Sequence, residues 1–278
     1  MQDSPWLGHL TDTDASVHLK TLFISDIHIG TRGCQAEALL DFLRHYDAQT
    51  IFLVGDIVDG WRLKSVWHWP PLHNVIVQKL LRKVRKGARI IYVPGNHDEF
   101  MRNYIGENFG GIEIAEEATY DLVDGRKALI LHGDKFDTVV RNIKWLAHLG
   151  DWAYEFAMYI NRYLNFVRRQ CGLPYWSFSA ASKAMVKQAV SFIGAFENAV
   201  VADARRQGAQ VVVCGHIHHA AMRHVGQVLY TNCGDWVESR TAIAEHFDGR
   251  LELIRWDEVV TGLQPAMPSN APELQPAV

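Results

Sequence analysis

Hydrophobic and polar positions alternate along the first hundred residues in a pattern typical of a layered α/β fold. Continuous apolar runs at 21–24, 50–54 and 88–93 predict strands that are buried on both faces. Between them, residues 35–46 and 74–85 carry apolar side chains at helical spacing, which predicts two amphipathic helices. The order of these elements favours a parallel sheet covered by helices.

Shorter strands follow in the rest of the chain and predict a second sheet. Two pairs of them are joined by the dipeptides Asp124-Gly125 and Asp248-Gly249, which are typical of tight hairpin turns. Two sheets that present their loop ends to a shared centre are the simplest assembly, of the α/β (α+β) class. The later strands are expected at 118–123, 127–131, 210–214, 227–233, 241–247 and 250–256.

Both ends of the chain lack this periodicity. Residues 1–20 are polar and carry acids where a secretion signal would need basic and then apolar residues, so we expect a flexible N-terminus without such a signal. Residues 258–278 are rich in proline and are expected to be disordered. One folded domain is therefore expected at 21–257, with a helical insertion at about 138–195.

Composition excludes several classes of protein. A hydrophobic content of 48% argues against disorder over most of the chain, and a net charge of -3 argues against a nucleic-acid partner. No uncharged run reaches the roughly 18 residues that a membrane-spanning helix needs. The four cysteines form no C-x-x-C pair, and we expect them to be reduced packing residues of a cytoplasmic protein: Cys34, Cys171, Cys214 and Cys233.

Candidate chemistry appears where the predicted strands end. Five apolar runs each lead into an Asp, Asn or His, and the carboxyl edge of a sheet is where open α/β folds place their sites. Five such endings predict one metal centre, although a single Asp or His in a loop is far more often a cap or turn former. The candidates are Asp26, His28, Asp56, Asn96, His97, Asp98, His132, Asp134, His216 and His218.

Residue types and spacing narrow down the metal. Asp26 and His28 are two positions apart, as are His216 and His218, so in an extended segment each pair would point to one side and share an ion. A mixed Asp/His/Asn set without cysteine suits Mn²⁺, Fe, Co or Zn better than Mg²⁺ or Ca²⁺. An alternative interpretation of Asp59 and Asp98 is that they are turn residues with no part in metal binding. Glycines adjoin the ligands and are expected to let the backbone approach the ions or a phosphate: Gly55, Gly95, Gly133 and Gly215.

The segment 138–195 has an unusual composition. It holds eleven aromatic residues, and seven Lys or Arg against two acids give it a charge of +5. Aromatic residues at helical spacing usually form a small core of their own. The alternative, which we favour, is a lid that offers apolar surface to an acyl chain and cations to phosphate. The expected substrate contacts are Arg141, Lys144, Trp145, Arg168 and Arg169.

The motifs Asp-x-His, Gly-Asp-x-x-Asp, Gly-Asn-His-Asp, His-Gly-Asp and Gly-His-x-His, in this order between residues 25 and 218, resemble the signature of the calcineurin-like metallophosphoesterases. The resemblance implies a β-sandwich flanked by helices, with two divalent ions between the sheets. It implies that His97 faces the phosphate and is oriented by Asp98. It also implies the ligand sets: Asp26, His28 and His218 for one ion, Asn96, His132 and His216 for the other, and Asp56 as a bridge.

Within this superfamily the chain is most similar to the UDP-2,3-diacylglucosamine pyrophosphohydrolases of lipid A synthesis. The similarity rests on the segment Asp56–Trp61 and on the helical insertion after His132-Gly133-Asp134. The chain differs from the best-studied of these enzymes, which have Arg where this chain has His97. The resemblance implies a lipid-nucleotide substrate and peripheral contact with the cytoplasmic face of an inner membrane.

The predicted reaction is hydrolysis at phosphorus, in which two cations, Mn²⁺ by preference, clamp the phosphate and present an activated water. A protein phosphatase, an exonuclease and a phosphodiesterase acting on a nucleotide use the same chemistry. The aromatic insertion argues against the first, and the absence of a large basic domain argues against the second. A metal-binding scaffold without activity is the alternative from a different class, and the full set of ligands together with His97 argues against it.

Overall fold

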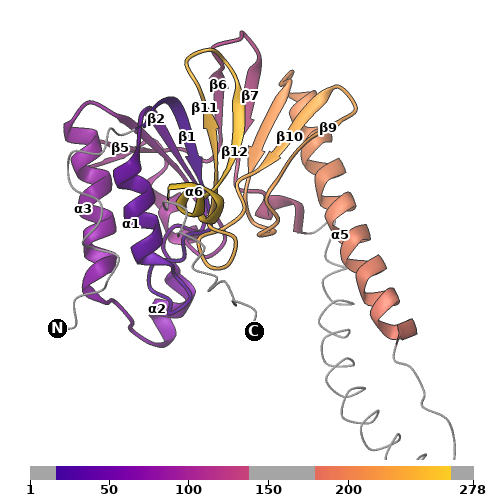
Figure 1. The fold of residues 1–278 in the computed structure, drawn as a ribbon, viewed down its shortest axis with the longest axis horizontal. Helices are drawn as coiled ribbons and strands as arrows, with labels where there is room; N and C mark the ends of the chain where they lie inside the picture. The colour runs from indigo at the N-terminus through magenta and orange to yellow at the C-terminus, as the bar shows by residue number, and fades with distance from the viewer. Residues whose placement is uncertain (1–16, 138–178, 264–278) are drawn as a thin grey trace, which may run out of the picture.

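The computed structural model of the protein describes residues 17–137 and 179–263. Within these residues two mixed β-sheets pack face to face, and helices cover the outer face of each sheet (Figure 1). The predicted two-sheet sandwich flanked by helices is therefore confirmed. No helix in the described part of the chain is both long enough and apolar enough to cross a membrane.

The larger sheet is parallel at its centre. Parallel pairing joins β1 to β2, β2 to β3 and β3 to β5, so the carboxyl ends of β1, β2 and β3 lie at the same edge. The remaining strands add to the two sides in antiparallel fashion. In spatial order the strands are β12 (Leu251–Arg255), β11 (Thr241–Glu245), β1 (Val17–Ile24), β2 (Tyr46–Val54), β3 (Arg89–Val93), β5 (Ile112–Ile114) and β4 (Asn108–Phe109).

The smaller sheet has a parallel core as well. Strands β7, β8 and β10 run parallel, and β6 and β9 pair with them in antiparallel fashion at the edges. The Asp124-Gly125 dipeptide lies in the turn between β6 and β7, where the sequence predicts a hairpin. In spatial order the strands are β6 (Ala118–Asp121), β7 (Lys127–Ile130), β8 (Val211–Cys214), β10 (Val228–Asn232) and β9 (Ala221–Val225).

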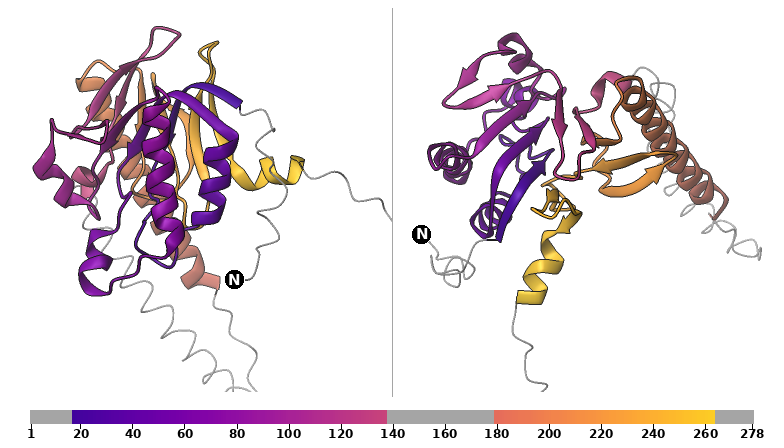
Figure 2. Two further views of the ribbon diagram at one scale, coloured as in Figure 1. Left: turned by 90° about the vertical axis from the view of Figure 1, so that its left-hand side faces the viewer. Right: turned by 90° about the horizontal axis from the view of Figure 1, so that it is seen from above.

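Helices close the sandwich on both sides. Two of them cover the larger sheet and one covers the smaller sheet (Figure 2). Two 3-10 turns, η1 (Glu99–Tyr104) and η2 (Asp134–Phe136), follow ligand-bearing loops. The helices are α1 (Ala36–His45) and α3 (Pro71–Arg85) on the larger sheet, α5 (Ser179–Arg206) on the smaller sheet, and the short α2 (Gly60–Ser65) and α6 (Trp256–Leu263).

Three apolar clusters hold these layers together. Between the sheets, Phe23 and Phe52 stack with ring centroids 5.2 Å apart, and Ile130 and Val213 of the smaller sheet complete the same cluster. This central cluster explains why the strands are apolar without interruption, since each inner strand packs against a sheet on one side and a helix on the other. It also fixes the two sheets relative to each other, and with them the loops at their ends.

The structure departs from the expected boundaries in several places. Strand β1 begins at Val17 because it pairs with Tyr46 of β2, inside the segment expected to be flexible. Helix α6 reaches Leu263, inside the segment expected to be disordered, because buried Trp256 anchors it against Phe42. The sequence patterns also did not predict α2, β4, β5 or β9. Of the expected insertion, residues 179–195 lie in α5 and residues 138–178 lie outside the described part.

Candidate metal centre

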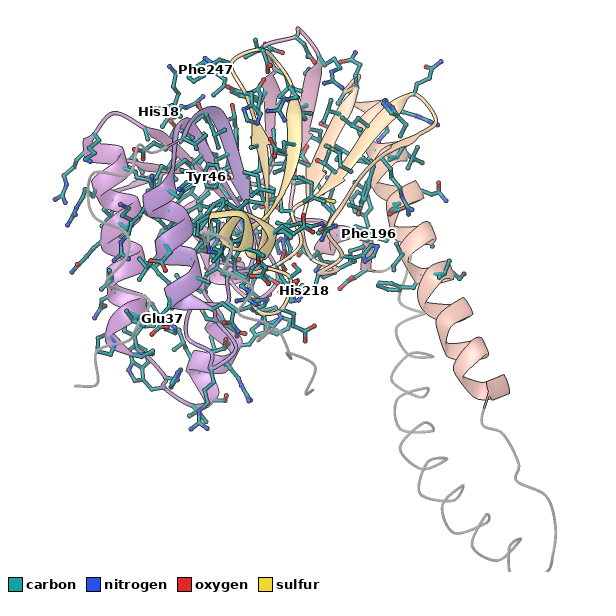
Figure 3. The ribbon with its side chains drawn as sticks, viewed as in Figure 1. His18, Glu37, Tyr46, Phe196, His218 and Phe247 are labelled. Atoms are coloured by element: carbon teal, nitrogen blue, oxygen red, sulfur yellow. The ribbon has the colours of Figure 1, made fainter. Side chains whose placement is uncertain are left out.

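The expected ligands converge at one edge of the sandwich. Both sheets contribute, because the carboxyl ends of their parallel strands meet at this edge. Figure 3 shows His218 near the bottom of the sandwich, between its two halves. Asp26 and His28 follow β1, Asp56 follows β2, Asn96 follows β3, His132 follows β7, and His216 and His218 follow β8.

One group of ligand atoms joins the two sheets. Asp26 Oδ1 lies 3.1 Å from Nε2 of His218, and Nε2 of His28 lies 3.3 Å from the same His218 nitrogen. All three atoms lie within 4.8 Å of one another, which is the spacing of atoms that can share one cation. The structure thus brings together the three residues predicted for the first ion.

A second group lies beside the first. Asp56, His132 and His216 also place their ligand atoms within 4.8 Å of one another, with His132 Nε2 3.4 Å from Asp56 Oδ2. The Asn96 Oδ1 atom is buried and has no hydrogen-bond partner. Asp56 falls in this second group, and its expected role as a bridge between two ions stays a prediction.

Buried polar atoms without a hydrogen bond indicate that these groups fit a cation. Asp26 Oδ1, Asn96 Oδ1 and His132 Nε2 are all buried without a hydrogen bond of acceptable geometry, and the first and third instead have ionic contacts, to His218 and Asp56 respectively. A buried polar atom without a hydrogen bond costs about 1–3 kcal/mol, so three in one place need an explanation. A divalent cation accepts electron pairs from carboxylate, amide and imidazole alike, and would satisfy all three atoms.

The backbone at the ligands is unusual. Five ligand residues have positive φ, a conformation that side chains other than glycine rarely adopt. Such conformations cost about 1–3 kcal/mol each and persist where the surrounding structure enforces them. The Asp-x-His and His-x-His pairs are therefore not extended. Asp26 and His28 still share one ligand group as expected, but the expectation that His216 and His218 share an ion is wrong, because they lie in different groups. The φ values are 51° for Asp26, 53° for His28, 53° for Asp56, 71° for His216 and 52° for His218.

Two glycines leave room for the ligand side chains. A Cβ atom on Gly55 would lie 2.1 Å from Nδ1 of His132, and one on Gly95 would lie 2.3 Å from Oδ1 of Asp56. Both distances are too short for any larger residue. The sequence analysis expected these glycines to admit ions or phosphate, whereas in the structure they admit ligands from neighbouring strands.

Asp59 holds two histidines of the centre. Its Oδ2 atom lies 3.3 Å from Nδ1 of His28 and 3.0 Å from Nδ1 of His97. Its Oδ1 atom accepts a hydrogen bond from the N–H of Arg62 and so caps α2. With Nδ1 engaged in this way, both rings direct Nε2 towards the centre. Burial alone would raise the pKa of Asp59, but these histidines and the Arg62 N–H hold it well below its ordinary value.

Asp98 has a different role from the one expected. Its carboxylate accepts hydrogen bonds from the N–H of Gly95, at 2.5 Å, and of Ile57, at 2.7 Å, and from the hydroxyl of Tyr92. These contacts tie the loop after β3 to the loop after β2. The side chain that orients His97 is Asp59, and Asp98 fixes the backbone that carries it. Burial raises the pKa of Asp98.

Charges at the centre are mutually dependent. Burial alone would lower the pKa of His132, but the adjacent Asp56 carboxylate raises it to about 10. Burial would raise the pKa of Asp56, yet His132 and the N–H of His97 keep it below 3.8. For His218, burial is likewise outweighed by Asp26, which raises the pKa. A cation bound here would take the place of protons on these rings.

The sequence analysis assigned no role at the centre to Asp59, Asp137 or Trp61. Asp137 Oδ1 lies 2.6 Å from Nε2 of His216, and the Trp61 ring lies 4.3 Å from the ring of His97. Asp59 could have been found, because it ends the Gly-Asp-x-x-Asp motif. Nothing local identifies Asp137 or Trp61. The predicted substrate contacts Arg141, Lys144, Trp145, Arg168 and Arg169 lie outside the described residues.

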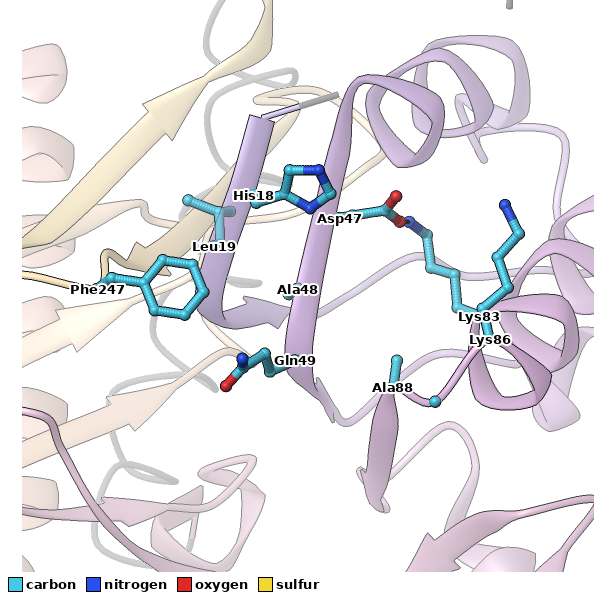
Figure 4. A pocket seen from close by; sticks show the side chains of 10 residues that line it. His18, Leu19, Asp47, Ala48, Gln49, Lys83, Lys86, Ala88 and Phe247 are labelled. Atoms are coloured by element: carbon cyan, nitrogen blue, oxygen red, sulfur yellow. Dashed lines mark hydrogen bonds and ion pairs between the residues drawn. The ribbon is translucent and has the colours of Figure 1, made fainter. Parts of the chain in front are cut away.

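A cavity of about 520 Å³ opens above the ligands. Its wall contains residues of both candidate groups together with His97 and Trp61. A second hollow, of about 390 Å³, lies at the other end of the strands and contains none of the candidate ligands (Figure 4). The chemistry of the protein therefore belongs to the first cavity.

Comparison with known proteins identifies the family of the chain. A family model described as calcineurin-like phosphoesterase matches residues 19–220, which is more than half of the chain. The chain therefore belongs to the calcineurin-like phosphoesterases, and the resemblance noted in the sequence is confirmed. The class defined by fold, family and ligand groups is that of metal-dependent phosphoesterases.

Curated relatives share the name UDP-2,3-diacylglucosamine hydrolase. The protein of that name from Cellvibrio japonicus is 34% identical over 144 residues, which are 47% of this chain and 59% of the relative. The one from Aeromonas salmonicida is 25% identical over 241 residues, which are 81% of this chain and 89% of the relative. Among solved structures, Yfce, a phosphoesterase from E. coli, aligns over 85% of this chain and 99% of its own, at 16% identity and a TM-score of 0.43.

Proposed function

We propose that the protein is a dinuclear-metal hydrolase that cleaves the pyrophosphate of a UDP-diacylglucosamine-type lipid precursor. The observation that carries the hydrolase is the pair of ligand groups, in which the buried atoms Asp26 Oδ1, Asn96 Oδ1 and His132 Nε2 have no hydrogen bond. When bound, two divalent cations, Mn²⁺ by preference, would neutralise phosphoryl oxygens and activate the attacking water.

The residues of the chain act around that chemistry. Asp26, His28 and His218 would hold one cation, and Asn96, His132 and His216 the other, with Asp56 shared between them. His97 lies in the cavity wall with its Nδ1 atom held by Asp59, so Nε2, 4.0 Å from Oδ2 of Asp56, would be the atom that donates a proton to a phosphoryl or leaving oxygen. The contact with Asp59 raises the pKa of His97 against the effect of burial, which favours the proton-donating form.

The lipid substrate is supported by the relatives and by composition. The curated relatives carry the name of a hydrolase acting on UDP-2,3-diacylglucosamine. The segment 138–195, with its eleven aromatics and charge of +5, suits an acyl chain and a diphosphate. Its residues Arg141, Lys144, Trp145, Arg168 and Arg169 would contact the substrate. An enzyme on such a substrate works at a membrane surface, and we include peripheral contact with the inner membrane in the proposal.

A second candidate is a phosphodiesterase or phosphatase acting on a nucleotide or another small phosphoester. His97 favours it, because the best-studied lipid A enzymes of this type have Arg at that place. The shared test compares hydrolysis of a diacylated UDP-sugar with hydrolysis of its deacylated counterpart, with Mn²⁺ supplied. Each buried methylene contributes about 0.8 kcal/mol, so a lipid enzyme should prefer the diacylated substrate by several orders of magnitude in kcat/KM. Equal kcat/KM values would favour the second candidate.

A further inference from the structure

The segment 61–70, which we call the tryptophan loop, exposes a large amount of apolar surface. It comprises most of α2 and the connection to α3. The exposed fraction is 74% for Trp67, 66% for Val66 and 47% for Trp61. Isolated exposed apolar residues are ordinary, but three within seven positions form a patch of the kind that marks an interaction surface.

The patch is built on fixed contacts. The ring of Trp67 stacks on that of Trp69, with centroids 5.9 Å apart and an interplanar angle of 24°. Trp69 in turn packs against the core and donates a hydrogen bond from Nε1 to Oδ1 of Asn74, at 2.8 Å. At its start, the loop is held by the cap from Asp59 to the N–H of Arg62. Trp67 is therefore held outward by the fold, with its apolar surface available to a partner.

The charge of the tryptophan loop has one sign. Arg62 and Lys64 are exposed, and no Asp or Glu occurs between Gly60 and Pro71, although the whole chain has a net charge of -3. A hollow of about 260 Å³ adjoins the loop at His68 and is lined by Arg32 as well. The acids beside the loop are the buried Asp59, which caps α2, Glu99, which accepts from Trp61 Nε1, and Glu37 in the wall of that hollow. The patch is complementary to a surface that is both apolar and anionic.

The tryptophan loop also borders the metal centre. Trp61 lies in the cavity wall, with its ring 4.3 Å from that of His97. Figure 1 shows α2 at the lower end of the larger sheet, the end at which the ligand-bearing loops lie. A surface in contact with this loop would therefore lie next to the mouth of the cavity.

We propose that the tryptophan loop docks the protein on a bilayer that contains anionic phospholipids. Trp67 and Val66 would enter the interfacial region, and Arg62 and Lys64 would lie against lipid phosphates, the arrangement by which amphipathic helices and aromatic residues bind membrane interfaces. A second copy of the chain fits less well, because a two-fold contact would place Arg62 and Lys64 of both copies together. The inference rests on the proposed function, because docking at this loop would bring the cavity to a lipid substrate in the membrane.

The test measures cosedimentation of the full-length protein with vesicles of phosphatidylcholine, alone or with a minor share of phosphatidylglycerol. The double variant V66S/W67S should reduce partitioning into the mixed vesicles by about tenfold or more, because its apolar contribution is lost. The matched control is F247S, since Phe247 is 52% exposed at the opposite end of the strands (Figure 3), and it should bind like the wild type.

A second variant tests the cations and covers the case in which V66S/W67S does not fold. R62Q/K64Q should lower binding to phosphatidylglycerol vesicles by about fivefold for each lost charge, and should remove most of the preference over phosphatidylcholine. Its control is R85Q/K86Q, which removes two exposed cations at the far end of α3.

Three outcomes would overturn the proposal. Wild-type binding by both loop variants would show that the loop does not dock. A change from dimer to monomer in V66S/W67S, without loss of vesicle binding, would assign the patch to a second copy. A large fall in melting temperature, again without loss of vesicle binding, would show that the chain itself covers the patch.

Hydrolysis of the detergent-dispersed diacylated substrate is measured separately. Vesicle binding without hydrolysis would count against the proposed substrate alone, and hydrolysis without loop-dependent binding would count against the docking surface alone.

Discussion

Two regions of this protein bury charged groups, and they do so in opposite ways. At the carboxyl ends of the parallel strands, Asp26 and His132 keep buried atoms without hydrogen-bond partners, on a backbone with five positive φ values. At the other end, Lys83 is only 4% exposed, yet its Nζ atom donates to the carbonyl oxygen of Tyr46 at 2.8 Å and pairs with Asp47 (Figure 4).

The difference shows how to separate function from stability among buried charges. Lys83 has its acceptors within the chain, so it requires nothing further and fastens α3 to β2. At the metal centre, by contrast, three buried ligand atoms, on Asp26, Asn96 and His132, have no hydrogen bond, and five of the ligand residues have strained backbone. Unsatisfied and strained groups together indicate a bound cation, whereas satisfied groups indicate structure. The charged groups that line the hollow beside Lys83 are therefore accounted for by their structural role, and no bound ligand is needed to explain them.

The largest effect should come from Asp56→Ala. It removes a carboxylate from the second ligand group, and a bound cation supplies several kcal/mol of charge stabilisation. Because each 1.4 kcal/mol is about tenfold in rate, turnover should fall by about a thousandfold or more. Metal content measured by mass spectrometry should fall with it. Asp47→Ala, at the opposite end of the strands, is the matched control and should keep both metal and turnover.

His97→Ala and Asp59→Asn should have smaller, distinguishable effects. His97→Ala should keep the metal content and lower kcat by at least about tenfold, as for a general acid or charge stabiliser.

Asp59→Asn should lower kcat and also weaken metal binding by about 10- to 100-fold, because Asp59 orients the ligand His28 too. Equal loss of metal in both variants would make His97 a ligand and contradict the role given to it here.

Lys83→Met should lower stability without lowering activity, the opposite of the effect expected at the metal centre. The carbonyl of Tyr46 and the carboxylate of Asp47 would lose their donor, which should lower the free energy of unfolding by about 1–3 kcal/mol. Chemical denaturation measures this change. Turnover per folded molecule should stay at the wild-type value, and a large fall would show that this end of the sheet communicates with the cavity.

The smallest effect concerns pH. Burial would raise the pKa of Asp47, but Lys83 lowers it below the ordinary value of 3.8. A carboxyl group with a depressed pKa in the folded state stabilises the fold above its unfolded pKa, and this contribution is lost as the pH falls through the folded pKa. The melting temperature of the wild type should therefore exceed that of Asp47→Asn at neutral pH, and this difference should disappear under acid conditions as Asp47 becomes protonated. If the melting temperatures of the two proteins changed with pH in the same way, the ion pair would contribute nothing measurable to stability.

Much of the fold could be predicted because apolar runs and helical periodicity are local signals. The runs before Asp26, Asp56 and Asn96 identified both the strands and the edge where the ligands lie. What could not be predicted depends on contacts across the fold. Asp26, with its positive φ, is held by distant segments, since its N–H donates to Gly55 and its carboxylate accepts from the N–H of His216. The partnership of Asp59 with His97 likewise joins two strand ends. The family resemblance instead implied Asp98, which is adjacent to His97 along the chain but directs its carboxylate to the N–H groups of Ile57 and Gly95.

That the ligands come from both sheets has a consequence for biosynthesis. Asp26 emerges early from the ribosome, but His218 follows β8, and the larger sheet itself stays incomplete until β11 pairs with β1. A nascent chain therefore carries five of the seven expected ligands before His216 and His218 complete the two ligand groups. Neither group is complete until most of the polypeptide has been synthesised, so the centre can form only late in translation.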